Sequence, residues 1–464
     1  METDSLLFSK SSNALAQFSE SASEEEPKLY RRRWVMLAIL TLLTAENLTQ
    51  WLFYSAISNI TEYHFGVSSF PAQCLSLNNL AIIMIFGLPA TFIINRTTLK
   101  SGILISGLLS LVALWMKFFG AGKNGFALSL CGQIFASFGT CFILPLPVQL
   151  ASIWFGIYER SLATSIAASC LSFGMGSAYL FAVQFVPDVE NHTKVEDGIR
   201  KSILVQAVLC STTIIAAVIL FDNVPPSPPS PSQAAVSTDE QVRPPYLHSL
   251  REMLSNTSFV LTGLTFGAVT GVLYTFFSLL SDIVLDNYDV DEDVVGWMGF
   301  IGSIIGIPGM LSAGFWLDRT KTYKKSFVGC SGLIFLTCLG FTLAVKYNAP
   351  ISVVYVLVGL FGFLTAALTT IGFLLGAELT YPVPELMSTG ALLTSGQAFG
   401  VLVLGITSYT VAAVSSEFVN WFITGICLFA FLVTPFIKSD FRRLAEDSQD
   451  SIASSSTIVA TKRK

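Results

Sequence analysis

Three side chains that could do chemistry lie inside long apolar stretches: Glu46, Trp51 and Tyr274. A carboxylate deep in an apolar span costs roughly 2.5–3.5 kcal/mol, so it usually faces a cavity or a partner. Glu46 is either a counter-charge or proton-binding group at a cavity edge, or a protonated carboxyl that is hydrogen-bonded inside a helix bundle. Asn47 and Trp51 share one helical face, and Glu46 lies about 100° around from it.

Aromatic faces attract an ammonium group with about 2 kcal/mol or more when the contact is desolvated. Trp51 and Tyr274 lie in the first and seventh apolar spans and are separated by 223 positions. Both residues can therefore contribute to a cation-binding site if the two spans are equivalent. The alternative is that each ring packs in a helix seam.

The composition is typical of a polytopic helical membrane protein. The chain has 464 residues, of which 52% are hydrophobic and 12% are charged, and its mean hydropathy is +0.65. A soluble domain carries about 25% charge. Apolar segments of about 20 residues, each long enough to cross a bilayer as a helix, recur along the chain. They lie near 34–58, 77–96, 102–121, 126–147, 161–185, 203–222, 257–284, 294–316, 326–346, 351–374, 387–412 and 417–437.

A Pro/Ser-rich stretch divides these twelve spans into six and six. Its prolines remove backbone donors and favour extended structure, so no packed core is expected there. We expect a disordered tail over 1–33, a first lobe over 34–222, a linker over 223–256, a second lobe over 257–437 and a tail over 438–464.

The positive charges predict the orientation, because cytosolic loops are enriched in lysine and arginine. With the N-terminus in the cytosol, only Lys117, Lys123, Lys194, Arg200, Lys201 and Lys346 of the 26 basic residues lie outside. Both termini and the linker are then cytosolic, and the plasma membrane is the expected location. The sequon that begins at Asn191 falls in an outer loop, where glycosylation is possible. Another outer loop is acidic, with Asp282, Asp286, Asp289, Asp291, Glu292 and Asp293.

The two halves repeat at the level of residues. Gly314 to Arg319 closes the eighth span, and Thr91 to Arg96 closes the second span 223 positions earlier. This layout resembles the major facilitator superfamily, which implies an all-α membrane protein with twelve transmembrane helices in two pseudo-symmetric six-helix lobes and substrate bound between them. The Gly-x-x-x-Asp-Arg element is similar to the cytosolic gate motif of that superfamily, although the first half has Asn95 in place of the acid. The implied gating residues are Asp318, Arg319, Glu159, Arg160, Glu378 and Glu385.

Several longer strings resemble the feline leukaemia virus subgroup C receptor family, also called solute carrier family 49, over residues 30–443. The linker and the Arg-Arg-Leu-Ala-Glu ending are most similar to the less characterised third member of that family. The strings include Tyr30-Arg-Arg-Arg-Trp-Val, Phe142-Ile-Leu-Pro-Leu-Pro147, Ala377-Glu-Leu-Thr-Tyr-Pro-Val-Pro-Glu385, Gly396-Gln397-Ala-Phe-Gly400 and Lys438-Ser-Asp-Phe-Arg-Arg443.

This resemblance implies a function and a site. Family members that carry choline or ethanolamine have a tryptophan and a tyrosine at the positions of Trp51 and Tyr274, and Gln397 matches a glutamine that helps to hold the substrate. Cys170 stands where better-known members carry another glutamine, so the exact substrate of those members cannot simply be assigned to this chain. The predicted substrate-binding residues are Trp51, Tyr274, Gln397, Cys170, Asn47 and Glu46.

The expected function is therefore alternating-access transport of a small organic cation that resembles choline or ethanolamine. Haem is the alternative substrate, but its propionates and iron favour buried cations or histidines, and His64, His192 and His248 all lie in loops. A receptor or scaffold that does not transport is a second alternative. An enzyme is not expected, since the sequence offers no nucleophile–histidine–acid set, phosphate loop or metal-ligand cluster. We expect a monomer in a lipid bilayer, with no cofactor, metal or nucleic-acid partner.

Overall fold

The computed structural model describes residues 30–156, 160–189, 191–226, 246–380, 383, 385–413 and 416–438. Regular structure in this part of the chain is entirely helical, and twelve segments are long and apolar enough to cross a membrane. The all-α class and the twelve spans predicted from the sequence are confirmed. The expectations for the tails, for linker positions 227–245 and for Glu159 lie outside the described residues.

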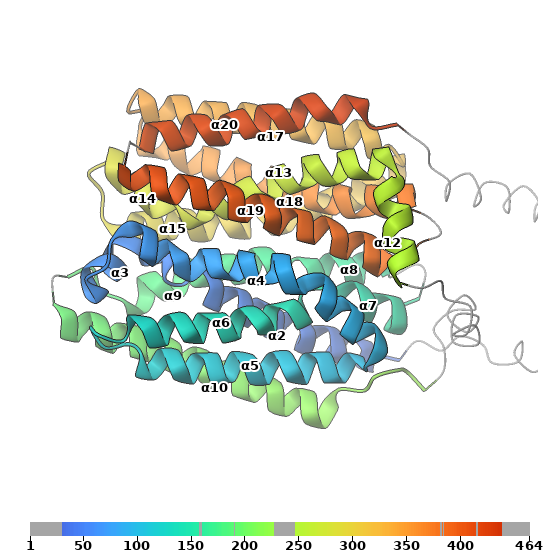
Figure 1. Cartoon of the computed structure of the whole chain (residues 1–464), viewed down its shortest axis with the longest axis horizontal. Coiled ribbons are helices and arrows are strands. Elements are labelled where there is room, and N and C mark those ends of the chain that lie inside the picture. The colour runs from blue at the N-terminus through green and yellow to red at the C-terminus, as the bar shows by residue number, and fades with distance from the viewer. Residues whose placement is uncertain are drawn as a thin grey trace, which may run out of the picture.

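The first set of helices forms one layer of the molecule, in blue and green in Figure 1. These elements are α2 (Arg32–Leu52), a 3-10 turn (Ser55–Ile57), α3 (Ser58–Phe65), α4 (Ser69–Arg96), α5 (Leu99–Phe119), α6 (Phe126–Ile143), α7 (Leu146–Trp154), α8 (Arg160–Ala168), α9 (Cys170–Phe185) and α10 (His192–Leu220).

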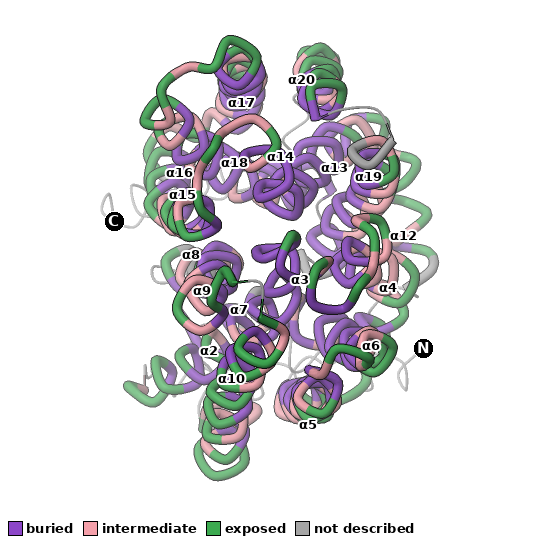
Figure 2. The backbone as a smooth tube through the Cα atoms, turned by 90° about the vertical axis from the view of Figure 1, so that its left-hand side faces the viewer, coloured by how far each residue is buried: buried purple, intermediate pink, exposed green. Residues whose placement is uncertain are grey.

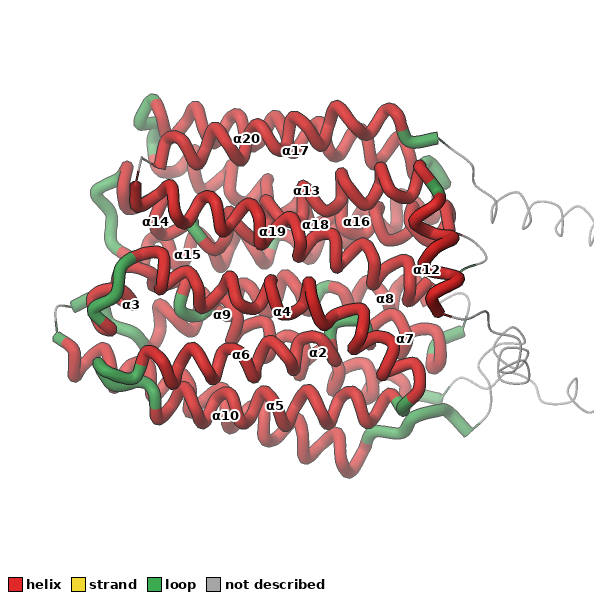
Figure 3. Tube along the Cα trace, viewed as in Figure 1, coloured by secondary structure: helices red, strands yellow, loops and turns green. Residues whose placement is uncertain are grey.

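The second set forms the other layer, in yellow to red. It contains α12 (Tyr246–Ser255), α13 (Thr257–Ser278), α14 (Leu280–Asn287), α15 (Glu292–Ile304), α16 (Gly306–Thr320), α17 (Tyr323–Lys346), α18 (Ile351–Thr380), α19 (Glu385–Ala413), α20 (Ser416–Val433) and a 3-10 turn (Thr434–Phe436). We call the two sets the N-lobe and the C-lobe. Figure 3 shows that most of the loops lie at the two ends of the helix bundle.

Two ends of the bundle are distinguished below. The terminal end carries α12 and the end of α20, and the distal end carries α3 and α14 (Figure 1). The first and seventh spans both stop short of the predicted boundaries, at Leu52 and Ser278, and a short helix follows each at the distal end. This shared interruption supports the internal repeat at the level of backbone structure.

The helices α2 and α13 lie at the centre of the molecule. In each of them 72% of the apolar span is buried, against 33–56% in the other ten spans. Figure 2 shows the same pattern along the bundle axis, with buried backbone inside and exposed backbone around it. The exposed rim carries large apolar side chains such as Leu108, Ile219 and Phe315, as a lipid-facing surface requires.

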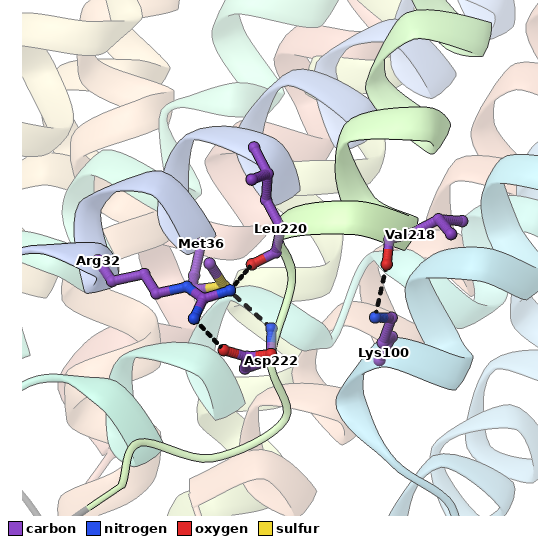
Figure 4. A network of polar contacts seen from close by, with 6 residues as sticks. All are labelled: Arg32, Met36, Lys100, Val218, Leu220 and Asp222. Atoms are coloured by element: carbon purple, nitrogen blue, oxygen red, sulfur yellow. Dashed lines mark hydrogen bonds and ion pairs between the residues drawn. The ribbon is translucent and has the colours of Figure 1, made fainter.

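Two cations close the terminal end of the N-lobe (Figure 4). The Arg32 guanidinium forms a 2.7 Å ion pair with Asp222 and donates to the carbonyl of Leu220 at 2.9 Å. The Lys100 ammonium donates to the carbonyl of Val218 at 2.9 Å. Both cations thereby satisfy carbonyls at the C-terminus of α10, where a helix leaves acceptors unpaired and favours positive charge.

Small residues allow helices to approach closely at the crossings. A Cβ atom on Gly362 of α18 would lie 1.9 Å from the carbonyl oxygen of Gly302 on α15. At the lobe interface, a Cβ on Gly299 would lie 2.5 Å from the ring of Tyr179 on α9. Small residues serve this purpose in membrane helices generally.

Gly362→Ala should destabilise the protein, because a backbone carbonyl blocks the added methyl and the two helices must move apart. Overpacking of this kind costs typically about 1–3 kcal/mol. We expect a lower midpoint of thermal unfolding in detergent. Gly329→Ala on α17 is the matched control, since nothing lies within 4 Å of its Cβ position. Equal midpoints for the two variants would contradict this account of the crossing.

Candidate functional site

Trp51 and Tyr274 meet across the interface between the lobes. Their ring centroids are 5.1 Å apart and their planes lie at 87°, an edge-to-face contact. Both side chains are buried, with 3% and 5% of their surface exposed. The indole N–H of Trp51 donates to the carbonyl of Ser76 at 3.2 Å, and the Ser76 hydroxyl donates to the carbonyl of Trp51 at 3.3 Å. The structure thus brings two of the predicted site residues into contact and holds one of them against α4.

Trp51 occupies a structurally special position at the end of α2. The helix stops at Leu52, one residue later, although the sequence placed Trp51 in the middle of a span. On the C-lobe side, a Cβ on Gly400 would lie 3.4 Å from the Tyr274 ring, so the glycine leaves space for that ring. Gln397, one turn earlier on α19, lies beside the Tyr274 hydroxyl and is 3% exposed.

A small cavity adjoins Tyr274 at the same interface. Its volume is about 30 Å³, and side chains of α9, α13, α15, α16, α18 and α19 line it. A cavity of this size holds one or two water-sized groups. Choline does not fit there, so the structure shows a closed arrangement in which the space beside Tyr274 is nearly filled.

Cys170 and Asn47 are held inside the N-lobe. Cys170 is the first residue of α9, is 1% exposed and lies near Thr44 of α2. The Asn47 amide donates to the Ser110 hydroxyl at 2.8 Å and to the carbonyl of Ala136 at 3.2 Å. These bonds occupy the Asn47 amino group within the lobe, away from the aromatic pair. The next two residues, Leu171 and Ser172, line the cavity, whereas Cys170 does not.

Glu46 faces other helices of its own lobe. Its carboxylate accepts a 2.8 Å hydrogen bond from Gln50, and the Lys117 ammonium lies 3.4 Å from the Gln50 carbonyl and 3.5 Å from its side-chain oxygen. Lys117 is 2% exposed, so this charge, which was counted on the outer side, is buried inside the lobe. Gly132 on α6 makes room for it, since a Cβ there would lie 2.9 Å from Lys117 Cγ. The arrangement matches the interpretation of Glu46 as a group bonded inside the bundle.

The distal end of the interface is held by four side chains that we call the distal clasp: Ser58, Gln73, Ser281 and Asp282. Ser58 donates to one oxygen of Asp282, and Gln73 donates to the other at 3.0 Å. Ser281 donates to the carbonyl of Ala56 at 3.1 Å. Ser58 and Ser281 are 223 positions apart, so equivalent serines bridge the lobes in both directions.

The acidic stretch had indicated solvated loop charges, but Asp282 and Glu292 are buried. They lie in α14 and α15 and are each 6% exposed. Burial raises the pKa of Asp282 to about 7; the hydrogen bonds from Ser58 and Gln73 oppose this shift, and the nearby charges of Glu62 and Asp286 add to it. A depression of about 510 Å³ beside the clasp keeps an acidic lining that includes Asp188, Asp286, Asp289 and Asp291.

The predicted gating residues lie at the terminal end. Asp318 belongs to α16, Arg160 is the first residue of α8, and these two helices are in contact. The Arg319 guanidinium lies 4.2 Å from the centroid of the Phe315 ring. Glu378 is buried near the end of α18, and Glu385 opens α19. The gating role of these residues remains a prediction.

Asn191 caps α10 at the distal end. Its side-chain oxygen accepts from the backbone N–H groups of Thr193 and Lys194 at 3.1 and 3.2 Å. The residue is exposed, and capping uses only its oxygen. The amide nitrogen that would carry a glycan is therefore compatible with the cap.

Sequence reasoning missed the distal clasp and Lys117. The polar run Gln73, Ser76 and Asn79 at one end of the second span, together with the repeat spacing between Ser58 and Ser281, was the available signal. Nothing in the local sequence showed that Lys117 points inward.

Comparisons with known proteins agree with this geometry. Residues 37–380 match the model of the Major Facilitator Superfamily. The choline/ethanolamine transporter flvcr2a of Danio rerio is 30% identical over 424 residues, which cover 91% of this chain and 90% of that protein. The choline/ethanolamine transporter FLVCR1 of Felis catus is 32% identical over 430 residues, covering 92% and 76% of the two chains. FLVCR2 of Homo sapiens, which has the same description, is 29% identical over 418 residues, covering 90% and 79%.

Solved structures support the fold. The E. coli fucose:proton symporter FucP superposes with a TM-score of 0.64 at 13% identity, covering 88% of this chain and 100% of that one. A bacterial homologue of the human lysosomal transporter Spinster, in an inward-facing and unoccupied conformation, gives a TM-score of 0.63 at 13% identity and covers 88% and 97%. The chain belongs to the major facilitator superfamily and, within it, to the feline leukaemia virus subgroup C receptor family of membrane transporters, solute carrier family 49.

Proposed function

We propose that this protein carries a small organic cation of the choline or ethanolamine class across a membrane by alternating access. The observation that carries the proposal is the contact between Trp51 and Tyr274, one ring from each lobe, at repeat-equivalent positions. When the lobes separate, each ring exposes a π face, and an ammonium group can take the place of the neighbouring ring edge. Relatives that are 30% and 32% identical are named choline/ethanolamine transporters.

Haem is the less favoured substrate. His64 and His192 lie together near the distal surface of the N-lobe, with ring centroids 5.7 Å apart, and His248 is exposed on α12. None of these three histidines lines the cavity beside Tyr274. A receptor or scaffold without transport is also less favoured, because the buried polar bridge between the lobes has no obvious use in a rigid protein.

The terminal end is proposed to face the cytosol, with the protein as a monomer in the plasma membrane. The basic residues Arg96, Lys100, Arg251 and Lys324 belong to that end, and the acidic depression belongs to the other. An acidic mouth raises the local concentration of cations. In this orientation the distal clasp is the proposed outer gate, and a charge-assisted contact of Asp318 is the proposed inner gate.

The aromatic pair is tested by substitutions that separate π character from bulk. Trp51→Leu keeps apolar volume but loses the quadrupole, so the apparent affinity for the cation should fall about 30-fold, the equivalent of roughly 2 kcal/mol. Tyr274→Phe keeps the ring and should retain most uptake. Trp316→Leu, on the exposed surface, is the control. The measurement is saturable uptake of radiolabelled choline and ethanolamine at matched surface expression. Unchanged uptake by Trp51→Leu would refute the aromatic site.

The outer gate should respond to pH through Asp282. An exposed aspartate has a pKa of about 4, and in the closed clasp this pKa rises to about 7. The closed form therefore binds the proton more tightly, and lowering the pH from about 7 to about 4 favours it. Above about 7 the carboxyl is ionised in both forms and the preference stays constant.

A cysteine at Ser278 reports this opening, because the residue is buried between Tyr274 and the clasp. With Cys74 and Cys131 changed to serine, maleimide labelling of Ser278→Cys is measured at pH 5.5 and 7.5. Each labelling rate is divided by the labelling rate of the same cysteine variant with Asp282→Asn added. This division cancels the effect of pH on the ionisation of the thiol. The ratio should rise with pH by on the order of tenfold. A constant ratio would show that Asp282 does not control the gate.

Glycosylation tests the orientation. If the distal end is outside, treatment with a glycosidase should increase the mobility of the protein on a gel. Thr193→Ala should abolish this shift while it leaves the Asn191 cap of α10 in place. Thr193→Ser preserves the sequon and should keep the shift. A tag at Lys464 should react with antibody only after permeabilisation, and reaction in intact cells would reverse the proposed orientation.

A further inference from the structure

The cavity beside Tyr274 contains two hydroxyl groups without partners. Thr270 Oγ1 and Ser303 Oγ are buried, and neither has a hydrogen-bond partner among the described residues. Thr270 and Ser303 are 3% and 4% exposed. Each unpaired buried polar group of this kind costs about 1–3 kcal/mol. Native proteins keep few such groups, so this pair requires an explanation.

Other hydroxyl groups in the same cavity do have hydrogen-bond partners. Thr365 donates to the carbonyl of Phe361 at 2.7 Å, and Thr369 donates to the carbonyl of Thr365 at 2.9 Å. Both bonds run back along α18 to the residue four positions earlier. Thr270 and Ser303 also lie on helices, yet their hydroxyls do not make this bond in the described structure. Their hydrogen-bonding capacity is open toward the cavity.

Gln397 adds a third open acceptor, next to the Tyr274 hydroxyl. Its side-chain oxygen is buried and has no partner within the described part of the chain. Thr270 reaches toward this helix, since a Cβ on Gly396 would lie 3.1 Å from the Thr270 methyl group. Thr270 and Ser303 line the cavity beside Tyr274, Gln397 lies at the hydroxyl of the same ring, and the cavity lining contains no ionised side chain.

This set of groups matches one kind of cation better than another. A primary ammonium donates three hydrogen bonds and is about the size of a water molecule, which the 30 Å³ cavity holds. A trimethylammonium group donates none, is larger, and would leave all three acceptors buried and unpaired. A site built to hydrogen-bond a group rejects the analogue that lacks it, because its own polar groups are then stranded.

We propose that Thr270, Ser303 and Gln397 form a subsite that binds the ammonium end of the substrate and selects primary amines such as ethanolamine over quaternary amines such as choline. The proposal rests on the transport function inferred above and specifies its substrate. It assigns the hydrogen-bonding role to hydroxyls of the C-lobe, whereas Cys170 in the N-lobe has no comparable capacity.

A methylation series tests the subsite directly. Ethanolamine, N-methylethanolamine, N,N-dimethylethanolamine and choline share a hydroxyl end and lose one N–H group at each step. We expect their apparent affinities, measured by inhibition of radiolabelled ethanolamine uptake, to fall along this order. Equal or increasing affinity toward choline would overturn the proposal, while Trp51-dependent uptake of choline would still support the proposed transport function. No saturable uptake of any of the four compounds would overturn both.

Substitutions in the subsite then show which residues produce the selectivity between the amines. Thr270→Val keeps the shape of the side chain, and Ser303→Ala removes only an oxygen. Each should weaken ethanolamine about tenfold, as loss of one hydrogen bond to a charged group does, but should not weaken choline, which would otherwise leave that group unpaired. Thr369→Val is the matched control, because its hydroxyl lines the cavity but is already bonded to Thr365. Stabilisation of the purified variants by each amine, measured as a shift in unfolding midpoint, verifies that they fold. Equal loss of both substrates would show a packing role and refute the subsite.

Discussion

The bilayer offers no hydrogen bonds, so every polar group in these helices must find its partner inside the protein. The chain meets this constraint within its lobes and departs from it at the interface. Within the N-lobe, Asn47 is bonded to the neighbouring helices α5 and α6, and Glu46 accepts a hydrogen bond from Gln50 on its own helix. At the interface, the hydroxyls of Thr270 and Ser303 are left open. Groups of the first kind hold a lobe together, and groups of the second kind are available to a passing molecule.

The distal clasp combines symmetry with one asymmetric charge. Equivalent serines at 58 and 281 bridge the lobes, but only the C-lobe supplies a carboxyl next to its serine, where the N-lobe has Asn59. A symmetric pair of serines would give a contact that does not depend on pH. The single aspartate makes the contact sensitive to protonation, and the hydrogen bonds from both Ser58 and Gln73 connect that sensitivity to the opposite lobe.

The sequence predicts those parts of the fold and site that depend on periodicity. Apolar length predicts twelve spans, and the spacing of 223 residues connects Trp51 with Tyr274, which do touch. The sequence could not predict contacts that depend on how the helices rotate and cross. Lys117 and Asp282 looked like surface charges because both lie near span ends, and only the packing of α5 against α6, and of α14 under the interface, buries them. The helix end at Leu52 was missed because no proline or glycine marks it.

The joints in the two facing spans of the interface have a mechanical consequence. The fifth span is divided at Ser169 into α8 and α9, and the eighth at Ile305 into α15 and α16; α9 contacts α15, and α8 contacts α16. Ser169 and Ile305 keep right-handed helical dihedrals, and backbone hydrogen bonds to Ser165 and Ile301 bridge the two joints, so each span continues through its joint. A continuous helix is a rigid element, so a displacement at the terminal end of either span is transmitted to its distal half.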